Sequence, residues 1–511
     1  MKSKLSIFAF VMLVFAGAAL VVGAQQSAGL TETSYRRARE VLDAGQKALG
    51  VWGAKPGFDD ISFKISGKLY TRNQSVSSEK TDSTPFAGEM VVDYAKNRIA
   101  VRQKGSFPGG FLLDNRVIWV ADKGSVVQYA FRTVNSIPNP QAKDNALVRV
   151  PHVLLVRAYE RANTLRWIGE AQFEGRKQNV IAFATAAGQQ NLLYFDAASN
   201  AFTKWETLGT DPVAGDAVTE FVFSGWQTVG GVKFPTGQTQ RVAGELAQDF
   251  QYSDIRVNSR PGDDAFAVPQ DYAEAPMAPA NQIRTQELGK DVWMVSGFGN
   301  NAYAPVIVAF NDYVMIIEPP LNEATSRAVL EKARELAPGK PVKYVAVTHH
   351  HSDHSGGART YFAEGVTLVT TPGNVKFFQR MAAARFTMPP DGLQLNPRAP
   401  SIETIQNKKR VFTDGTHTVE LYDIGPNPHA NEMVVAWLPK ERILYTGDLF
   451  ARDPLNRVTP AIAATEHLAQ TIEKLGLNVD KLVEVHSGVN TMADVRLALE
   501  LARNGGQRAA Q

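Results

Sequence analysis

The pattern of apolar and polar positions changes about halfway along this chain. Between residues 30 and 272, apolar and polar residues alternate in short runs, as at Ile61, Phe63 and Ile65, and this period of two is typical of half-buried β-strands. Similar runs cover residues 89–94, 98–103, 117–121, 179–184 and 202–206. Gly230-Gly231 lies between two further runs, which favours a β-hairpin. Helical spacing predicts helices at residues 30–49, ended by Gly50, and at about 151–162.

Beyond an Ala- and Pro-rich linker at residues 273–284, predicted strands and helices follow one another. Asn322 is placed to cap a helix that ends at Pro338-Gly339. Apolar runs predict strands at residues 292–295, 306–310, 313–317 and 342–347. We therefore expect an α/β chain (α+β overall), with a mainly antiparallel β-sheet domain at 30–272 and a layered α/β domain at 285–505.

Residues 1–24 are organised like a secretory signal peptide. Lys2 and Lys4 precede an apolar run, and Val22-Gly23-Ala24 offers small residues for cleavage. An uncleaved membrane anchor is the alternative, because the run is nearly long enough to span a bilayer. We expect a periplasmic or secreted protein. The chain has no cysteine, which excludes disulfides, and its net charge of only +3 gives no support to nucleic-acid binding.

Four of the nine histidines fall within residues 349–354, directly after a predicted strand. His349, His351, Asp353 and His354 make the pattern H-x-H-x-D-H. Imidazole and carboxylate are ligands that Zn²⁺ and similar ions accept. Two histidines spaced two apart can converge on one ion, while Asp353 and His354 on the following turn can reach a second. His350 would point elsewhere.

Three further candidate ligands each follow a predicted strand and lie beside Gly or Pro: His429, Asp448 and His486. Loops at strand ends are where layered α/β folds commonly assemble their active sites. Each of these residues alone would more often be structural, as we expect of His152, His417 and His467. Glu318 ends an inner strand, and we expect it to hold loops near the site.

With these motifs in this order, residues 285–505 resemble the metallo-β-lactamase superfamily. The resemblance implies a four-layer αβ/βα sandwich with a two-metal site at one edge. It also implies the ligands: His349, His351 and His429 for a first metal, Asp353, His354 and His486 for a second, and Asp448 as the bridge. We expect two Zn²⁺ ions, with Fe or Mn as alternatives.

The strand succession of residues 30–272, and the closing stretch 225–235, resemble the lipoprotein-carrier-like half-barrels of bacterial envelopes. This resemblance implies a concave apolar surface that would hold a lipid-like ligand. A structural or dimerising sheet without a ligand is the alternative.

These features predict a binuclear hydrolase in which a metal-bridging hydroxide attacks the substrate, and Asp353 orients that hydroxide and takes up its proton. Asp448 argues against a true β-lactamase, where the matching position is usually Cys or Ser. We expect a small-molecule ester, lactone or amide with an apolar part. The apolar residues of segment 377–408 either line its pocket or belong to the core: Phe377, Phe378, Met381, Phe386 and Met388.

Two other hypotheses stay open. A phosphodiesterase would need phosphate-binding cations near the metals, and the available ones are Arg385, Lys408, Lys409 and Arg410. The second hypothesis is a lipid-binding envelope protein whose metal domain is not catalytic.

Overall fold

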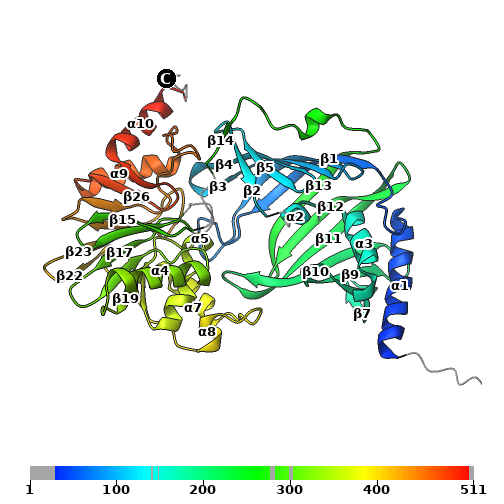
Figure 1. The fold of residues 1–511 in the computed structure, drawn as a ribbon, viewed down its shortest axis with the longest axis horizontal. Coiled ribbons are helices and arrows are strands. Elements are labelled where there is room, and N and C mark those ends of the chain that lie inside the picture. Colours follow the sequence, from blue (N-terminus) through cyan, green and yellow to red (C-terminus); the bar gives the residue numbers. More distant parts are fainter. Residues whose placement is uncertain (1–28, 140–141, 148, 277–281, 299–302, 506–511) are drawn as a thin grey trace, which may run out of the picture.

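The computed structural model of the protein describes residues 29–139, 142–147, 149–276, 282–298 and 303–505. The predicted signal peptide, residues 1–24, lies outside the described residues. None of the helices in the described ranges is long and apolar enough to span a membrane. Figure 1 shows a large curved sheet from the first half of the chain beside a layered domain from the second half.

The first half forms one sheet, which contains 14 strands among the described residues in the order β14-β6-β5-β4-β3-β2-β1-β13-β12-β11-β10-β9-β8-β7. Neighbours pair antiparallel, except that β14 runs parallel to β6. The strands are β1 (Asp60–Tyr70), β2 (Ser83–Asp93), β3 (Arg98–Phe107), β4 (Phe111–Val120), β5 (Lys123–Gln128), β6 (Thr133–Ile137), β7 (Arg166–Phe173), β8 (Arg176–Ala184), β9 (Gln190–Asp196), β10 (Phe202–Asp211), β11 (Gly215–Val229), β12 (Val232–Val242), β13 (Glu245–Val257) and β14 (Ala273–Glu274). The predicted hairpin joins β11 to β12, with Val229 opposite Val232.

Helices cover part of this sheet. They are α1 (Leu30–Leu49), α2 (Ala142–Leu147) and α3 (Pro151–Glu160), with short 3₁₀ turns η1 (Pro108–Gly110), η2 (Ala162–Thr164) and η3 (Asp263–Phe266). Gly50 ends α1 in the left-handed conformation, as predicted. Apolar residues of α1 and α3, such as Leu42 and Leu155, pack in one core with Phe195 and Phe202 of the sheet. Both helices lie at the end of the molecule remote from the layered domain (Figure 1).

His152 of α3 is buried inside this domain and has a structural role. Its ring stacks on Phe234, with centroids 5.5 Å apart, and its Nε2 donates to the Lys233 carbonyl oxygen at 2.7 Å. Burial lowers the pKa of His152 to about 4. The His152 ring is therefore uncharged in the folded protein.

We expect this histidine to make the protein sensitive to acid. Below pH 6.5 the unfolded chain binds a proton that the folded chain refuses until about pH 4, so the free energy of unfolding falls as the pH falls through this window. The loss from this group is about 2 kcal/mol between pH 6.5 and pH 5. Urea unfolding of the wild type and of His152→Phe at pH 6.5 and pH 5 measures this loss. Between these pH values, the free energy of unfolding of the variant should fall by about 2 kcal/mol less than that of the wild type. Equal losses would contradict this account.

The second half contains two sheets among its described residues. The first has the order β15-β16-β17-β18-β19-β20-β21 and the second β22-β23-β24-β25-β26-β27. Their strands are β15 (Arg284–Gly289), β16 (Val292–Ser296), β17 (Val306–Ala309), β18 (Val314–Ile317), β19 (Val342–Ala346), β20 (Thr367–Thr370), β21 (Ile402–Thr404), β22 (Lys409–Thr413), β23 (Thr418–Asp423), β24 (Val434–Leu438), β25 (Ile443–Tyr445), β26 (Lys481–Glu484) and β27 (Gly488–Thr491).

Most helices of this half lie on the outer faces of the two sheets, whereas the short α5 lies in the loop after β19. They are α4 (Glu323–Leu336), α5 (Ser352–Ser355), α6 (Ala358–Glu364), α7 (Val375–Ala383), α8 (Gly392–Leu395), α9 (Ala463–Leu475) and α10 (Met492–Arg503), with the 3₁₀ turn η4 (Pro372–Asn374). One core lies between the sheets, a second packs α4, α6 and α7 on the first sheet, and a third packs α9 and α10 on the second. The predicted four-layer αβ/βα sandwich is confirmed. Asn322 caps α4 by accepting from the Thr325 amide at 3.1 Å, as predicted.

The structure decides between the two interpretations of segment 377–408. Phe377, Phe378 and Met381 are buried on α7 in the core against the first sheet. Phe386 is also buried, against the Arg359 guanidinium. Phe377, Phe378 and Met381 thus belong to the core, while Met388 is exposed. None of the five residues lines the cavity described below, so the apolar part of a substrate pocket has to come from elsewhere. In the predicted linker 273–284 the structure places β14 and the first residue of β15, and residues 277–281 lie outside the described residues.

Candidate metal centre

All seven candidate ligands lie together at one edge of the two central sheets. The loop after β19 supplies His349, His351, Asp353 and His354, and the loops after β23, β25 and β26 supply His429, Asp448 and His486. Their ligand atoms fall into two groups, in each of which every atom lies within 4.8 Å of the others. The first group is His349, His351, His429 and Asp448, and the second is Asp353, His354, Asp448 and His486.

Asp448 belongs to both groups. Its Oδ1 lies 3.0 Å from the Nε2 atoms of His354 and His486, and its Oδ2 lies 3.3 Å from Nε2 of His429. Gly447 makes this placement possible, because it has a φ of 56° and an added Cβ would come within 2.9 Å of Thr348 Oγ1. The two oxygens of one carboxylate thus face the two groups, which is the geometry of a bridging ligand.

The hydrogen bonds of the first group leave lone pairs pointing at one another. The Thr348 hydroxyl donates to Glu318 at 2.9 Å and therefore accepts from Nδ1 of His349, also at 2.9 Å. Nδ1 of His429 donates to the Pro108 carbonyl oxygen at 3.2 Å. Both rings then carry their lone pair on Nε2, and these two atoms lie 3.0 Å apart. Such a contact is repulsive unless a cation lies between the rings, so the donor set fits a metal ion.

His351 also donates from one ring nitrogen and carries a lone pair on the other. Its Nε2 donates to the Ser75 carbonyl oxygen at 2.9 Å, which places the lone pair on Nδ1. Nδ1 is buried and has no hydrogen-bond partner among the described residues. A buried nitrogen without a partner is costly, and ligation of a metal would satisfy it.

The second group holds two carboxylates, Asp353 and Asp448, where the first has Asp448 alone. Burial works to lower the pKa of His354 and His486, but the neighbouring carboxylates together outweigh it. Asp448, Asp353 and Glu318 hold the pKa of His354 well above its usual value, and Asp448 and Glu484 hold the pKa of His486 at about 9. Burial lowers the pKa of His349 and His351 well below the usual value. His349 and His351 of the first group are therefore neutral imidazoles, while the second group attracts positive charge, and both properties suit divalent cations.

Two buried glutamates support the ligand loops. Glu318 accepts from the Thr348 hydroxyl, and its Oε1 lies 3.6 Å from Nδ1 of His354, so it contacts the loop after β19 at both ends of the histidine cluster. Glu484 accepts from the backbone amides of His486 and Ser487 at 2.9 and 2.5 Å. Burial raises the pKa of Glu484 to about 7.

Two segments of the N-terminal sheet also reach the metal centre, and the sequence analysis did not predict them. The β1–β2 loop, residues 71–82, brings the Ser75 carbonyl to His351, and Nε2 of Gln74 donates to Oδ1 of Asp353 at 2.7 Å. The turn η1 brings the Pro108 carbonyl to His429. These blue segments run toward α5 in Figure 1. The N-terminal sheet thus fixes the orientation of three candidate ligands.

The remaining sequence candidates lie apart from the two groups. His350 is buried with its ring 5.5 Å from Phe377, and neither of its ring nitrogens has a hydrogen-bond partner in the described part of the chain. Three of the four cations considered for phosphate binding are paired with acids elsewhere: Lys408 with Asp423, Lys409 with Glu420 and Arg410 with Glu403. The fourth, Arg385, lies beside the N-terminal sheet, where its carbonyl oxygen accepts from the Asp216 amide at 2.7 Å. A residue that the sequence analysis missed, Tyr303, places its hydroxyl 3.4 Å from Oδ2 of Asp353.

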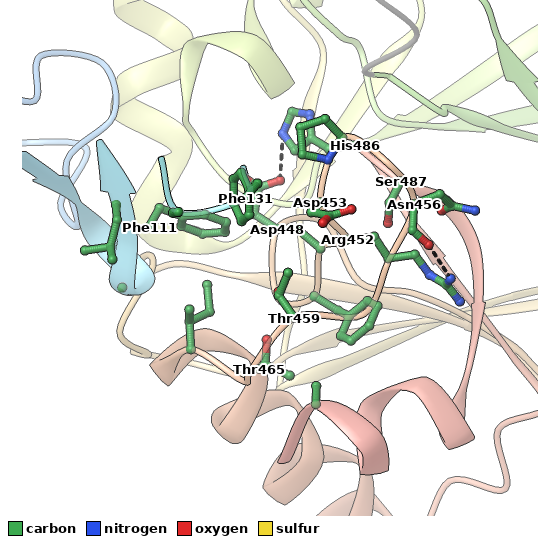
Figure 2. Close-up of a pocket in the computed structure, with 18 of the residues that line it drawn as sticks. Phe111, Phe131, Asp448, Arg452, Asp453, Asn456, Thr459, Thr465, His486 and Ser487 are labelled. Atoms are coloured by element: carbon green, nitrogen blue, oxygen red, sulfur yellow. Dashed lines mark hydrogen bonds and ion pairs between the residues drawn. The ribbon is translucent and has the colours of Figure 1, made fainter. Parts of the chain in front are cut away.

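A cavity of about 1550 Å³ opens onto the metal centre and is lined by both halves of the chain. Asp448 and His486 lie in the middle of the view in Figure 2, with Phe111 and Phe131 to one side and Arg452, Asn456 and Ser487 to the other. Its volume exceeds the roughly 300–1,000 Å³ of ordinary small-molecule pockets.

Residues 301–486 match the sequence profile of the metallo-β-lactamase superfamily, and this range contains all seven candidate ligands. The C-terminal domain belongs to the metallo-β-lactamase superfamily. It is a hydrolase of that superfamily.

Individual relatives are distant. The chain is 25% identical over 202 residues to a probable hydroxyacylglutathione hydrolase of Schizosaccharomyces pombe, covering 36% of this chain and 76% of that protein. It is 22% identical over 204 residues to the alpha subunit of a 2,4-dinitroanisole O-demethylase of Nocardioides, covering 40% of this chain and 57% of the subunit. A solved metallo-β-lactamase from Pontibacter korlensis superposes with a TM-score of 0.34 at 19% identity, covering 44% of this chain and all of that one.

We expect the superfamily domain to need Gln74, from the β1–β2 loop of the N-terminal sheet, for full metal affinity and full activity. Gln74→Met keeps the length of the side chain but removes the donor to Asp353, so this carboxylate is free to rotate. The affinity for metal and kcat should each fall about tenfold. The control is Glu79→Gln in the same loop, which breaks the 2.8 Å ion pair with Arg380 and leaves the metal centre untouched. Chelator competition measures the metal affinity of both variants, and steady-state kinetics measure their kcat. Equal metal affinity and equal kcat in the two variants would contradict this role of Gln74.

Proposed function

We propose that this protein is a binuclear metal-dependent hydrolase that cleaves an ester, lactone or amide bond of a small uncharged molecule. The observation that carries the proposal is the position of Asp448, whose two oxygens face two complete ligand groups. In this proposal His349, His351 and His429 hold one metal, and Asp353, His354 and His486 hold the other. The histidine-rich set favours Zn²⁺ for both positions, and Fe or Mn can use the same donors.

When bound, the two metals supply a water of lowered pKa and an electrophilic contact for the substrate carbonyl oxygen. Asp353 accepts a proton from the attacking water through its carboxylate, which the Gln74 amide prevents from rotating. The proton then passes to the departing alcohol or amine, so that the products are an acid and that alcohol or amine. Burial and the Asp353 charge raise the pKa of Tyr303, which therefore stays protonated as a donor beside this carboxylate.

The charge of the cavity favours a carboxylic substrate over a phosphodiester. The arginines that line the cavity are Arg132, which pairs with Asp271, and Arg452, which pairs with Asp494 at 2.7 Å. Phosphate recognition uses cations that are free to form bidentate contacts. Lys408, Lys409 and Arg410 are paired with Asp423, Glu420 and Glu403, and neither these cations nor Arg385 line the cavity. The described lining therefore offers no such group, and the phosphodiesterase hypothesis loses its support.

The lipid-binding hypothesis concerns the N-terminal sheet alone. The apolar faces of α1 and α3 already pack on that sheet in one core, which supports a structural role for this part of the domain. The periplasmic or secreted location belongs to the same proposal and rests on the signal-like character of residues 1–24.

A hydrolase screen tests the proposed function. The purified mature protein is assayed on nitrophenyl esters, lactones, nitrophenyl anilides and bis-nitrophenyl phosphate, with and without a chelator. We expect turnover of a carboxylic ester, lactone or amide that the chelator abolishes and added Zn²⁺ restores. Turnover of the phosphodiester alone, or turnover that the chelator does not affect, would contradict the proposal.

A further inference from the structure

One wall of the cavity consists of apolar side chains from the N-terminal sheet. Residues 107–112 around η1 and residues 129–131 of the β5–β6 turn supply the side chains of Phe107, Phe111, Leu112, Tyr129 and Phe131. Leu112 is 71% exposed and Phe107 36% exposed, so the domain core does not bury them. Apolar side chains gathered in a concave site are typical of ligand-binding surfaces.

This wall is fixed to the metal centre. The Gly109 amide donates to the Pro428 carbonyl at 2.8 Å, next to His429, and the Phe111 ring lies 5.6 Å from the His429 ring. On the other turn, the Phe131 carbonyl accepts from the Arg457 guanidinium at 2.7 Å. The apolar wall therefore begins beside a candidate ligand and keeps its position relative to the reacting centre.

Away from the metal centre, the two arginines of the lining are already paired. Arg452 donates to Asn490 at 2.6 Å and to the Asn456 carbonyl at 2.8 Å, besides its ion pair with Asp494. The exposed Arg132 pairs with Asp271 and lies over the Tyr272 ring. A charged group on the substrate would lose hydration here without gaining a free partner.

We propose that residues 107–112 and 129–131 form the subsite for an apolar, uncharged substituent of the substrate, such as an alkyl or aryl chain of an ester. The N-terminal sheet then sets the specificity of the hydrolase, while the superfamily domain supplies the reacting groups. This inference rests on the proposed function, and it names the class of substrate that the same site takes.

The experiment compares nitrophenyl esters of acetate, butyrate, hexanoate and octanoate, together with an octanoate analogue that ends in a carboxylate. For the wild-type protein, kcat/KM should rise by about 2- to 4-fold for each added methylene group. The terminal carboxylate should lower it at least about tenfold. In Phe131→Ala, the ratio of kcat/KM for octanoate to kcat/KM for acetate should fall about tenfold. The metal content should stay that of the wild type, since the backbone bond from the Phe131 carbonyl to Arg457 is kept.

The matched control is Leu208→Ala on β10, which removes an apolar side chain of the same sheet that is 47% exposed and does not line the cavity. This variant should keep the chain-length dependence of the wild type. Acetate turnover without any dependence on chain length, or an equal loss on acetate and octanoate in Phe131→Ala, would overturn the inference and leave the proposed function standing.

A binding measurement keeps the two proposals separable. Nile red, an uncharged apolar dye, should bind the wild type and Leu208→Ala equally and bind Phe131→Ala at least about fivefold more weakly. If no ester is hydrolysed but this difference is found, the proposed function fails and the subsite stands. If all three proteins bind the dye alike, the subsite is contradicted.

Discussion

Replacing Asp448 by Asn should remove most of the bound metal and nearly all of the activity. The variant keeps the shape of the side chain, but an amide offers one neutral oxygen where the carboxylate has two charged ones. Because Oδ1 faces His354 and His486 while Oδ2 faces His429, both groups lose a ligand at once. We expect the metal content to drop below one ion per chain and kcat/KM to fall on the order of 10³-fold or more, which is about 4 kcal/mol of transition-state stabilisation.

The control for this prediction lies in the same histidine cluster. His350→Phe replaces a ring that packs on Phe377 and whose nitrogens have no hydrogen-bond partner in the part of the chain that the structure describes. It should retain the metals and at least about half of the activity. Elemental analysis and kinetics of the two variants give the comparison. An Asp448→Asn protein with wild-type metal content and activity within tenfold of the wild type would show that Asp448 is no bridge.

Replacing Gly109 by Ala should weaken metal binding although the residue belongs to the N-terminal sheet. Gly109 has a φ of 88°, and an added Cβ would lie 2.9 Å from Nδ1 of His429 and 3.3 Å from its Cβ. The methyl group would push the ring away from the Pro108 carbonyl, which orients it. Since loss of such an outer partner typically costs 10- to 100-fold in metal affinity, we expect a fall of about that size.

Gly110→Ala is a matched control for the backbone. Gly110 has a similar φ of 94°, so the alanine brings comparable strain, but its Cβ would meet Ile462 at 3.3 Å instead of a candidate ligand. We expect its metal affinity to stay within about threefold of the wild type. Competition with a chromogenic chelator measures both variants. Equal losses would mean that backbone strain alone, and not contact with His429, is responsible.

The candidate ligands could be predicted from the sequence because each is a side chain of the right chemical type in a segment that follows a strand. His349 and His351 follow β19 directly, and Asp448 and His486 follow β25 and β26. Period-two and helical spacing likewise predicted the sheets and α1, since burial of one face imposes these periods on the sequence.

The contribution of the N-terminal sheet could not be predicted in this way. Ser75 and Pro108 act through backbone carbonyl groups, which every residue has, so their side chains carry no signal. Ser75 also lies 276 residues from the histidine that it orients, and only tertiary packing brings the two together. A similar limit applied to Phe377, because an apolar helix face has the same spacing whether it faces a core or a ligand pocket.

The central claim is that one carboxylate joins two metal positions, and the metal content of the purified protein tests it most directly. The apoprotein is titrated with Zn²⁺, and bound metal is counted by elemental analysis after gel filtration. The account predicts two ions per chain in the wild type and in His350→Phe, and fewer than one in Asp448→Asn. Saturation of the wild type at one ion per chain, or no retained metal at all, would contradict it.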